Sequence, residues 1–175
     1  MNYAQLRTHD VANGPGVRVS LFVSGCTHRC VGCFNSEAWD FEYGNPFDST
    51  VADSIISALA PSYIKGFSLL GGEPFEPCNQ AVLAPLLERI KTVYPHKTVW
   101  CYTGYDFETD ILACRLGDKQ VTERMISNID VLVDGKFILE QKDLSLRFRG
   151  SSNQRIIDVP RSLAEGRAVL ADGYN

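Results

Sequence analysis

Hydrophobic positions along this chain fall into short apolar runs that alternate with longer segments of helical periodicity. Strands are predicted at the apolar or β-branched runs 17–23, 67–70, 98–102, 131–133 and 155–159. Helices are predicted at 49–60 and 79–94, where apolar residues recur every three or four positions, and within 107–114 and 121–128. This alternation is typical of an α/β fold in which crossover helices join parallel strands.

Chemically distinctive residues follow the predicted strands directly. Cys26, Cys30 and Cys33 come just after the strand at 17–23, and a Gly-Gly-Glu-Pro segment at 71–74 follows the strand at 67–70. The carboxyl ends of parallel strands meet at one edge of a sheet, where α/β proteins build their sites. We therefore expect these two segments to contribute to one site.

Three cysteines at this short spacing indicate a metal site. Thiolates are the usual ligands of iron–sulfur clusters, and a loop carrying Cys26, Cys30 and Cys33 can hold three irons of a 4Fe–4S cube. If no fourth protein ligand binds, one iron keeps open positions for chemistry, as catalytic zinc sites do. Spacing alone leaves two alternatives: a structural zinc site that recruits His28, and a redox or disulfide role.

The remaining cysteines form no second cluster by spacing. Cys101 lies in an apolar strand and Cys114 in a predicted helix, so both are expected to be packed core residues. Cys78 follows the Gly-Gly-Glu-Pro segment closely enough to approach the site. If Cys78 ligated the fourth iron, the open position would be lost.

Composition narrows the functional class. The 175 residues are 45% hydrophobic and 22% charged, which is ordinary for a soluble globular domain. A net charge of −4 gives no support for nucleic-acid binding, although residues 136–167 carry +3 and could contact an acidic partner. No apolar run approaches the roughly 18 residues of a membrane span, and no secretory signal is visible, so we expect a cytoplasmic protein with reduced thiols.

The motifs together resemble the radical S-adenosylmethionine superfamily. Its cysteine signature is similar to Cys26-x3-Cys30-x2-Cys33 followed by the aromatic Phe34, and its glycine motif is similar to residues 71–74. Phe34 stands where tyrosine is common, and Glu73 where aspartate also occurs. With two motifs in the expected order, the resemblance favours the iron–sulfur cluster over zinc.

Within this superfamily, the chain is similar to the family of activating proteins of anaerobic ribonucleoside-triphosphate reductase. That resemblance covers roughly residues 1–155 and rests on Trp39 and on the segments 13–16, 24–26, 33–35, 103–105, 131–137 and 149–154. It implies a parallel β/α incomplete barrel, formed by a domain at residues 1–160. The tail at 161–175 matches no pattern and has no expected role.

The resemblance also implies a mechanism. A 4Fe–4S cluster held by Cys26, Cys30 and Cys33 would cleave S-adenosylmethionine reductively, and the 5′-deoxyadenosyl radical would take a hydrogen atom from a glycine of the reductase catalytic subunit. Reduced flavodoxin is the implied electron donor. Catalysis requires no side chain beyond the cluster and S-adenosylmethionine.

Ligand-binding residues follow from the same resemblance. Gly71, Gly72 and Glu73 are expected to accept hydrogen bonds from the methionine ammonium, because glycines let the backbone approach a ligand closely. Gly32, Cys33 and Phe34 are expected to hold adenine, with the Phe34 ring as a stacking face. Asp134 is a weaker candidate for a contact to the methionine or ribose part, and the segment 149–154 either closes the open side of the sheet or contacts the partner.

Other functions remain open at this point. An activase of another glycyl-radical enzyme, such as pyruvate formate-lyase, would share the cysteine spacing, but members of that group are generally longer. A small metal-binding protein without catalysis is the alternative from another class. The deazaguanine-forming radical enzyme has a much longer first cysteine interval and is discounted.

Overall fold

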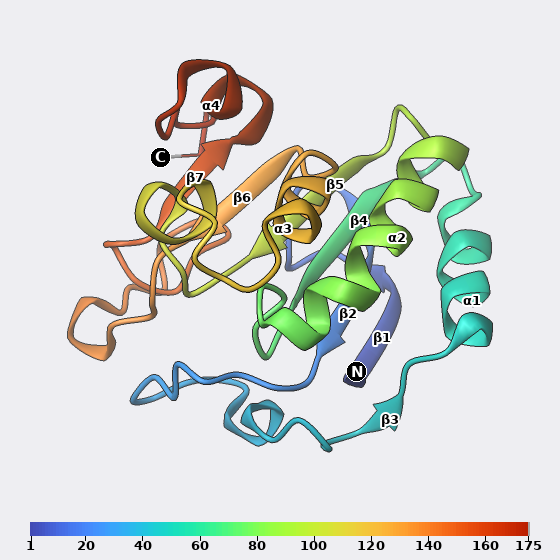
Figure 1. Cartoon of the computed structure of the whole chain (residues 1–175), viewed down its shortest axis with the longest axis horizontal. Coiled ribbons are helices and arrows are strands. Elements are labelled where there is room, and N and C mark those ends of the chain that lie inside the picture. Colours follow the sequence, from blue (N-terminus) through green and yellow to red (C-terminus); the bar gives the residue numbers. More distant parts are fainter. Residues whose placement is uncertain (175) are drawn as a thin grey trace.

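The apolar runs of the sequence form one mixed sheet of seven strands in a computed structural model, which describes residues 1–174 (Figure 1). In chain order the strands are β1 Asn2–Asp10, β2 Val17–Val23, β3 Asn45–Pro46, β4 Ile64–Gly71, β5 Thr98–Tyr102, β6 Val131–Asp134 and β7 Arg155–Asp158. Their order across the sheet is β3-β1-β2-β4-β5-β6-β7. The central strands β2, β4, β5 and β6 are parallel, whereas β3, β1 and β7 each run antiparallel to a neighbour.

Helices connect the parallel strands and cover one face of the sheet (Figure 1). They are α1 Ser49–Leu59, α2 Pro77–Val93 and α3 Lys119–Ile126. A further helix, α4 Val159–Glu165, follows β7, and three short helical turns are η1 Ser36–Trp39, η2 Phe107–Leu112 and η3 Leu139–Gln141. Asp48 and Asp118 cap α1 and α3 by accepting bonds from backbone N–H groups of the first turn. Within residues 1–174, no helix combines the length and the apolar character that crossing a bilayer requires.

The α/β class and every predicted strand are confirmed, but the flanking elements were missed. Strand β1 has a largely polar sequence, and most of its side chains are exposed or half-buried at the sheet's margin. Only the two-residue strand β3 pairs with its outer side, so most of β1 lies at the edge of the sheet, where a strand carries a weak apolar signal. Helix α4 begins directly after β7 and spans residue 160, where the sequence ended the main domain. That domain boundary stays a prediction.

Alternation along the strands gives the sheet two different faces. Val19, Leu69 and Val99 belong to the main core beneath the helices, together with helix residues such as Leu83 and Leu87. Residues of opposite parity, including Arg18 and Trp100, face the other way, as the two-residue period of a strand requires. No helix of α1–α3 covers this second face, and the site lies on it.

Arg18 is fully buried on the second face. Its guanidinium donates to the carbonyls of Phe67 at 2.7 Å and Thr98 at 2.8 Å and to the Ser68 hydroxyl at 2.7 Å, and it lies over the Trp100 ring. Burial lowers the pKa of Arg18 to about 10. The side chain fastens three neighbouring strands, β2, β4 and β5, behind the site.

The C-terminal segment closes part of the second face. After α4 the chain turns back beside β7, with Ala171 N–H donating to Ile156 O at 2.8 Å. Tyr174 then packs edge-on against Trp100, with ring centroids 5.3 Å apart, and also contacts Phe148. The tail, for which the sequence suggested no role, therefore covers sheet residues that would otherwise be exposed.

Candidate metal and ligand site

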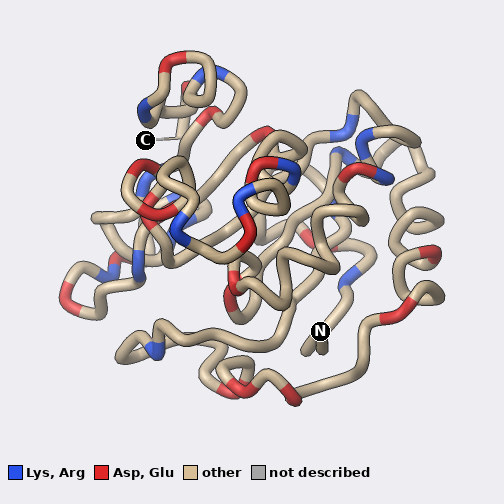
Figure 2. Tube along the Cα trace, in the orientation of Figure 1, with Lys and Arg blue, Asp and Glu red and all other residues tan. Residues whose placement is uncertain are grey.

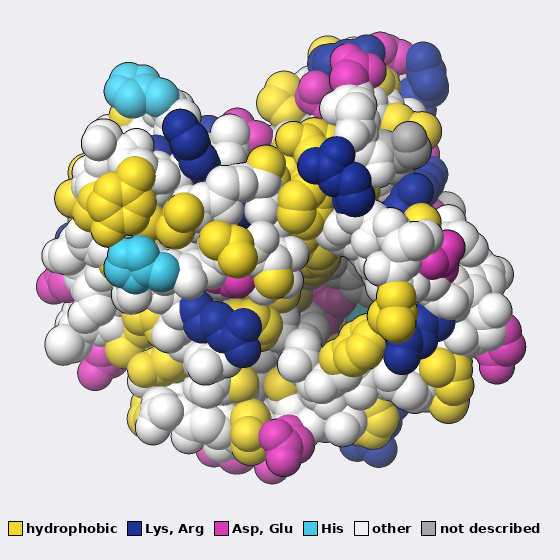
Figure 3. All heavy atoms as spheres, turned by 180° about the vertical axis from the view of Figure 1, so that it is seen from behind, with side chains coloured by type: hydrophobic (Ala, Val, Ile, Leu, Met, Phe, Trp, Pro, Cys, Tyr) yellow, Lys and Arg dark blue, Asp and Glu magenta, His cyan; other side chains and the backbone are white. Residues whose placement is uncertain are grey.

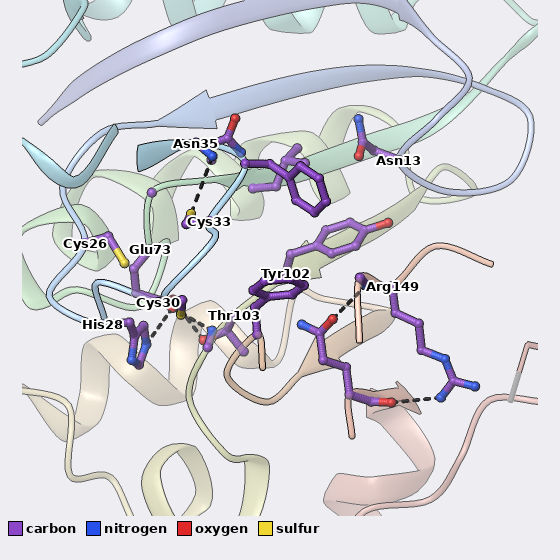
Figure 4. A pocket seen from close by; sticks show the side chains of 18 of the residues that line it. Asn13, Cys26, His28, Cys30, Cys33, Asn35, Glu73, Tyr102, Thr103 and Arg149 are labelled. Atoms are coloured by element: carbon purple, nitrogen blue, oxygen red, sulfur yellow. Dashed lines mark hydrogen bonds and ion pairs between the residues drawn. The ribbon is translucent and has the colours of Figure 1, made fainter. Parts of the chain in front are cut away.

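A cavity of about 780 Å³ opens on the second face, at the carboxyl ends of β2, β4 and β5. Figure 3 shows it as a hollow in the face opposite the helices. Cys26, Cys30 and Cys33 line it together with residues 71–73, so the structure brings the two predicted segments to one place. Figure 4 shows the cysteines at one end of the cavity, and Asn13 and Arg149 at the other.

Backbone hydrogen bonds fix the start of the cysteine loop, residues 26–35, to its surroundings. Gly25 N–H donates to Ala38 O at 2.8 Å, and Cys26 N–H donates to Trp39 O at 3.2 Å. The buried Glu76 carboxylate accepts from both the N–H and the hydroxyl of Thr27, at 2.8 and 2.6 Å. The first cysteine is thus held against η1 on one side and the start of α2 on the other.

The thiols differ in exposure and are chemically suited to a metal. Cys26 is buried, whereas Cys30 and Cys33 are half-buried. Burial raises the pKa of Cys26 to about 11 and also raises that of Cys30. A buried thiol gives up its proton when a metal cation replaces it. Asn35 N–H donates to Cys33 Sγ at 3.4 Å, the kind of bond that tunes metal-bound sulfur.

The spacing of the thiols argues against a single zinc ion. Zinc ligands at a bond length of about 2.3 Å lie roughly 3.8 Å apart. In the part of the chain that the structure describes, the group of Cys, His, Asp and Glu ligand atoms within 4.8 Å of one another is Asp106, Glu108 and Asp134, not the cysteines. At least one pair of the three thiols is therefore more than 4.8 Å apart, farther than two ligands of one zinc ion lie.

His28, the proposed fourth zinc ligand, has other partners. Its Nε2 lies 3.0 Å from Glu73 Oε2, and its ring packs edge-on against Tyr105 with centroids 4.3 Å apart. Cys78 is exposed in the first turn of α2 and does not line the cavity. Cys101 is buried in the main core, as predicted. The same prediction for Cys114 is wrong: this residue follows η2 in a turn with a φ of +50° and is only half-buried, outside the core cluster. None of these residues completes a set of four ligands with the three loop cysteines.

The Glu73 carboxylate joins the site's segments and is the most heavily bonded group in it. One oxygen accepts from Phe75 N–H at 2.9 Å and the Thr103 hydroxyl at 2.8 Å. The other accepts from Gly104 N–H at 2.8 Å and lies beside His28. The side chain is 1% exposed. Sequence reasoning expected Glu73 to contact a ligand, but it missed this role of tying β4, β5 and the cysteine loop together.

Gly71 and Gly72 are required by close backbone packing. Gly71 has φ of +112°, and a Cβ there would lie 2.6 Å from Val23 backbone atoms. A Cβ on Gly72 would lie 2.6 Å from Gly25 O and 2.8 Å from Ala38 O. Both glycines therefore let β4 end directly against the base of the cysteine loop.

Phe34 and Gly32 lie where the cysteine loop meets the segment after β6. Phe34 lines the cavity and is 67% exposed, with its ring centroid 5.7 Å from that of Phe137. The Lys142 ammonium lies 4.9 Å from the Phe34 ring centroid. Gly32 packs against Leu139, whose Cδ1 would lie 2.8 Å from an added Cβ, and it does not itself line the cavity.

Two lining residues that sequence reasoning did not select carry unpaired polar atoms. The Tyr102 hydroxyl and the Trp39 indole N–H are buried and have no hydrogen-bond partner within residues 1–174. Buried donors without partners are rare, and they mark where a ligand would supply an acceptor. Tyr102 ends β5, and this position at a strand's carboxyl end was the available signal.

Asp134 does not line the cavity. Its carboxylate accepts from Arg155 Nε and Phe107 N–H, both at 3.0 Å, so it ends β6 in an ion pair. The segment 149–154 does border the cavity through Arg149, Gly150 and Gln154, and the Gln154 amide oxygen accepts from Gly150 and Ser151 N–H groups. This loop is internally bonded and forms the cavity wall farthest from the cysteines.

Comparisons with known proteins agree on one family. Residues 12–157 match the family model described as a 4Fe-4S single cluster domain. Curated proteins named anaerobic ribonucleoside-triphosphate reductase-activating protein are 48% identical in Haemophilus influenzae and 45% in Vibrio cholerae, each over 158 residues, covering 89% of this chain and 97% of the relative. The protein of that name from Escherichia coli K12 is 43% identical over 156 residues, which cover 88% of this chain and 96% of the relative.

Proposed function

Because this chain belongs to the family of anaerobic ribonucleoside-triphosphate reductase-activating proteins, we propose that it generates a glycyl radical on such a reductase with a 4Fe–4S cluster and S-adenosylmethionine. The observation that carries this proposal is the shared cavity: the three loop cysteines and the Gly71–Gly72 backbone line the same space. Neither segment alone would distinguish a radical enzyme from a simpler iron–sulfur protein.

Cys26, Cys30 and Cys33 are the proposed cluster ligands. Their support is the cavity they share, a thiol spacing wider than a single zinc ion needs, and the Asn35 N–H bond to Cys33 Sγ. Cys78, Cys101 and Cys114 are not proposed as a fourth cluster ligand, because none of them lines the cavity. An iron with open positions is what a chelating substrate requires.

S-adenosylmethionine is the proposed second occupant of the cavity. Gly71 and Gly72 present backbone at its floor, and the buried Glu73 carboxylate adds a fixed negative charge there that favours the methionine ammonium. The cysteine-loop residues Gly32, Cys33 and Phe34 are the proposed adenine contacts; Cys33 and Phe34 line the cavity, whereas Gly32 lies next to them in the loop, against Leu139. The unpaired Tyr102 and Trp39 donors suit a ligand as rich in acceptors as a nucleoside.

When bound, the cluster and S-adenosylmethionine supply one-electron chemistry that cleaves a carbon–sulfur bond and removes a hydrogen atom from a backbone glycine of the reductase. The chain's own residues hold the cysteine ligands in position and enclose the reactive species. Glu73 and Glu76 hold the cysteine loop through His28 and Thr27, so the ligands keep their places during turnover. Apolar side chains such as Leu70 and Phe22 line the cavity and limit water around a reactive radical.

Three finer features belong to the same proposal. The sheet would be an incomplete barrel whose open side admits the partner; the support is a cavity on the face that no crossover helix covers. Reduced flavodoxin would be the electron donor. The site of action would be the cytoplasm, where thiols stay reduced.

Reductive cleavage of S-adenosylmethionine by the anaerobically reconstituted chain tests the chemistry. We expect methionine and 5′-deoxyadenosine from the wild type, and their loss in Cys26→Ala, Cys30→Ala and Cys33→Ala. Cys78→Ala is the matched control and should keep cleavage. A wild type that binds a cluster without cleaving S-adenosylmethionine would instead be a non-catalytic metal-binding protein.

A further inference from the structure

The four most exposed large hydrophobic side chains among residues 1–174 lie in the cavity lining or in segments that contribute to it. They are Leu144, Val31, Val11 and Phe34, exposed by 85, 73, 71 and 67%. Phe34 and Leu144 line the cavity, Val31 lies in the cysteine loop, and Val11 precedes the lining residues Ala12 and Asn13. Single exposed apolar residues are normal on a protein surface, but a group of them around one opening indicates an interaction site.

Leu144 lies at the tip of an ordered loop, residues 136–150, which we call the flap. The base of the flap is closed by Asp143 N–H donating to Gly150 O, and by Ser152 N–H donating to Gln141 O at 2.9 Å. Next to Leu144, the Asp143 carboxylate also accepts hydrogen bonds from both the N–H and the hydroxyl of Ser145, at 2.8 and 2.7 Å. An apolar side chain presented by an already ordered loop loses little conformational entropy on binding.

The flap packs against aromatic residues on the second face of the sheet. Phe148 packs edge-on against Trp100, with centroids 5.4 Å apart, and against Tyr174 of the C-terminal tail at 5.9 Å. On the other side, Phe137 and Lys142 of the flap contact the Phe34 ring. The flap and the cysteine loop therefore form one continuous surface beside the cavity.

This surface is basic on an acidic protein. The cysteine loop and the flap together carry five basic residues and two acidic ones, a charge of +3 in a chain of net −4: Arg29, Lys136, Lys142, Arg147, Arg149, Glu140 and Asp143. Figure 2 shows blue positions on both segments, and Figure 3 shows yellow and dark-blue side chains next to each other around the hollow. Such a surface attracts an acidic partner and repels a basic one.

We propose that the cysteine loop and the flap form the docking surface for an acidic patch with an apolar centre, located on the reductase around its target glycine. This inference rests on the proposed function, because the target glycine must reach the cavity mouth that the surface surrounds. A second copy of this chain seated there would block the mouth. An electron donor needs only to approach the cluster and has no need of the opening.

Binding of the cluster-loaded chain to the purified reductase catalytic subunit tests the proposal. Leu144→Ser and Arg147→Glu are each expected to raise Kd about tenfold, the range of a central interface residue. Val93→Ser at the end of α2 and Lys119→Glu on α3 are matched controls, because both side chains are exposed and neither belongs to the cavity lining, the cysteine loop or the flap. The controls should bind like the wild type, and wild-type Kd should rise with salt.

Two further measurements separate the possible outcomes. Cleavage of S-adenosylmethionine with dithionite and without reductase should be unchanged in Arg147→Glu, whose side chain does not line the cavity. The far-UV circular dichroism and the iron content of Leu144→Ser should match those of the wild type, which shows that this variant also folds. Failure of the wild type to form a glycyl radical would overturn the proposed function itself. A wild type that forms the radical, with both variants binding the reductase normally, would overturn only the docking surface. So would a weakening confined to flavodoxin binding or to self-association of the chain.

Discussion

Glu73→Gln removes one charge from the most heavily bonded side chain of the site while keeping its shape. The native carboxylate accepts from two backbone N–H groups, that of the buried Phe75 on one oxygen and that of the half-buried Gly104 on the other. It also accepts from the Thr103 hydroxyl and pairs with His28. A glutamine has one acceptor oxygen and one NH2 group. Its NH2 group must therefore replace one of the two carboxylate oxygens and face the hydrogen-bond donors that this oxygen served.

Either orientation of the amide leaves one backbone N–H without an acceptor. If the NH2 group faces Phe75, the Thr103 hydroxyl can turn and accept, but Phe75 N–H cannot. If it faces Gly104, His28 can change tautomer, but Gly104 N–H cannot. A buried unpaired donor costs about 1–3 kcal/mol, and losing the charge weakens the remaining bonds. We expect a loss of about 2–4 kcal/mol from a total of roughly 5–15 kcal/mol.

Glu76→Gln is the matched control for this reasoning. Glu76 is also buried and also holds the cysteine loop, but both bonds from Thr27 end on the same oxygen. A glutamine can keep that oxygen in place, so we expect a loss of less than about 1 kcal/mol.

Urea unfolding of the cluster-free chain under reducing conditions measures both variants. The midpoint should fall by about 1–2 M for Glu73→Gln, at a slope typical of small proteins, and by much less for Glu76→Gln. Equal losses of stability in the two variants would refute the argument that Glu73 uses both carboxylate oxygens and Glu76 only one. A wild-type midpoint in Glu73→Gln would refute the role of Glu73 in joining β4, β5 and the cysteine loop.

Three further predictions test separate parts of the structure. Cys26→Ala, Cys30→Ala and Cys33→Ala should each lower iron bound after reconstitution, whereas Cys114→Ala should bind iron like the wild type; normal iron content in all three loop variants would exclude them as ligands. Gly72→Ala places a Cβ 2.6 Å from Gly25 O and should cost about 1–3 kcal/mol with reduced cluster loading. Gly166→Ala, whose Cβ would meet nothing within 4 Å, bears only the strain of its φ of +67° and should load the cluster normally; an equal loss of cluster loading in the two variants would contradict the packing argument. The Arg155 hydrogen bond holds the pKa of Glu108 below its ordinary 4.5, so this carboxylate stabilises the fold above pH 4.5 and its contribution is lost as pH falls through the folded value. The urea midpoint of Glu108→Gln should therefore lie below that of wild type at pH 7 and converge with it in acid, and a gap that widens in acid would contradict this sign.

Local pattern predicted most of the fold because the central strands carry an unbroken row of apolar residues on the face beneath the helices, such as Val19, Leu69 and Val99. The run 17–23 and the run 98–102 became β2 and β5 with the predicted bounds. Strand β1 was missed because an edge strand needs few apolar residues. The antiparallel direction of β1 and β7 could not be seen either, since direction depends on which neighbour a strand joins and not on its own residues.

The site was predictable in its segments but not in its contacts. Cysteine spacing and the Gly-Gly-Glu-Pro segment identified the cavity lining, because both lie next to strand ends. The partners of Glu73 come from residues 28, 75, 103 and 104, and only the folded chain brings them together. Tyr102 and the flap tip at Leu144 were missed for the same reason, since their position at the cavity depends on the sheet's curvature and on loop packing.

The glycyl radical itself tests the central claim most directly. The reconstituted chain, S-adenosylmethionine, dithionite and the reductase catalytic subunit would be mixed anaerobically, and the reductase would be examined by EPR. We predict the doublet signal of a glycyl radical with the wild-type chain and no signal with Cys26→Ala, Cys30→Ala or Cys33→Ala. Absence of the doublet with a wild-type chain that carries its cluster, or a full doublet with any of these three variants, would contradict the claim.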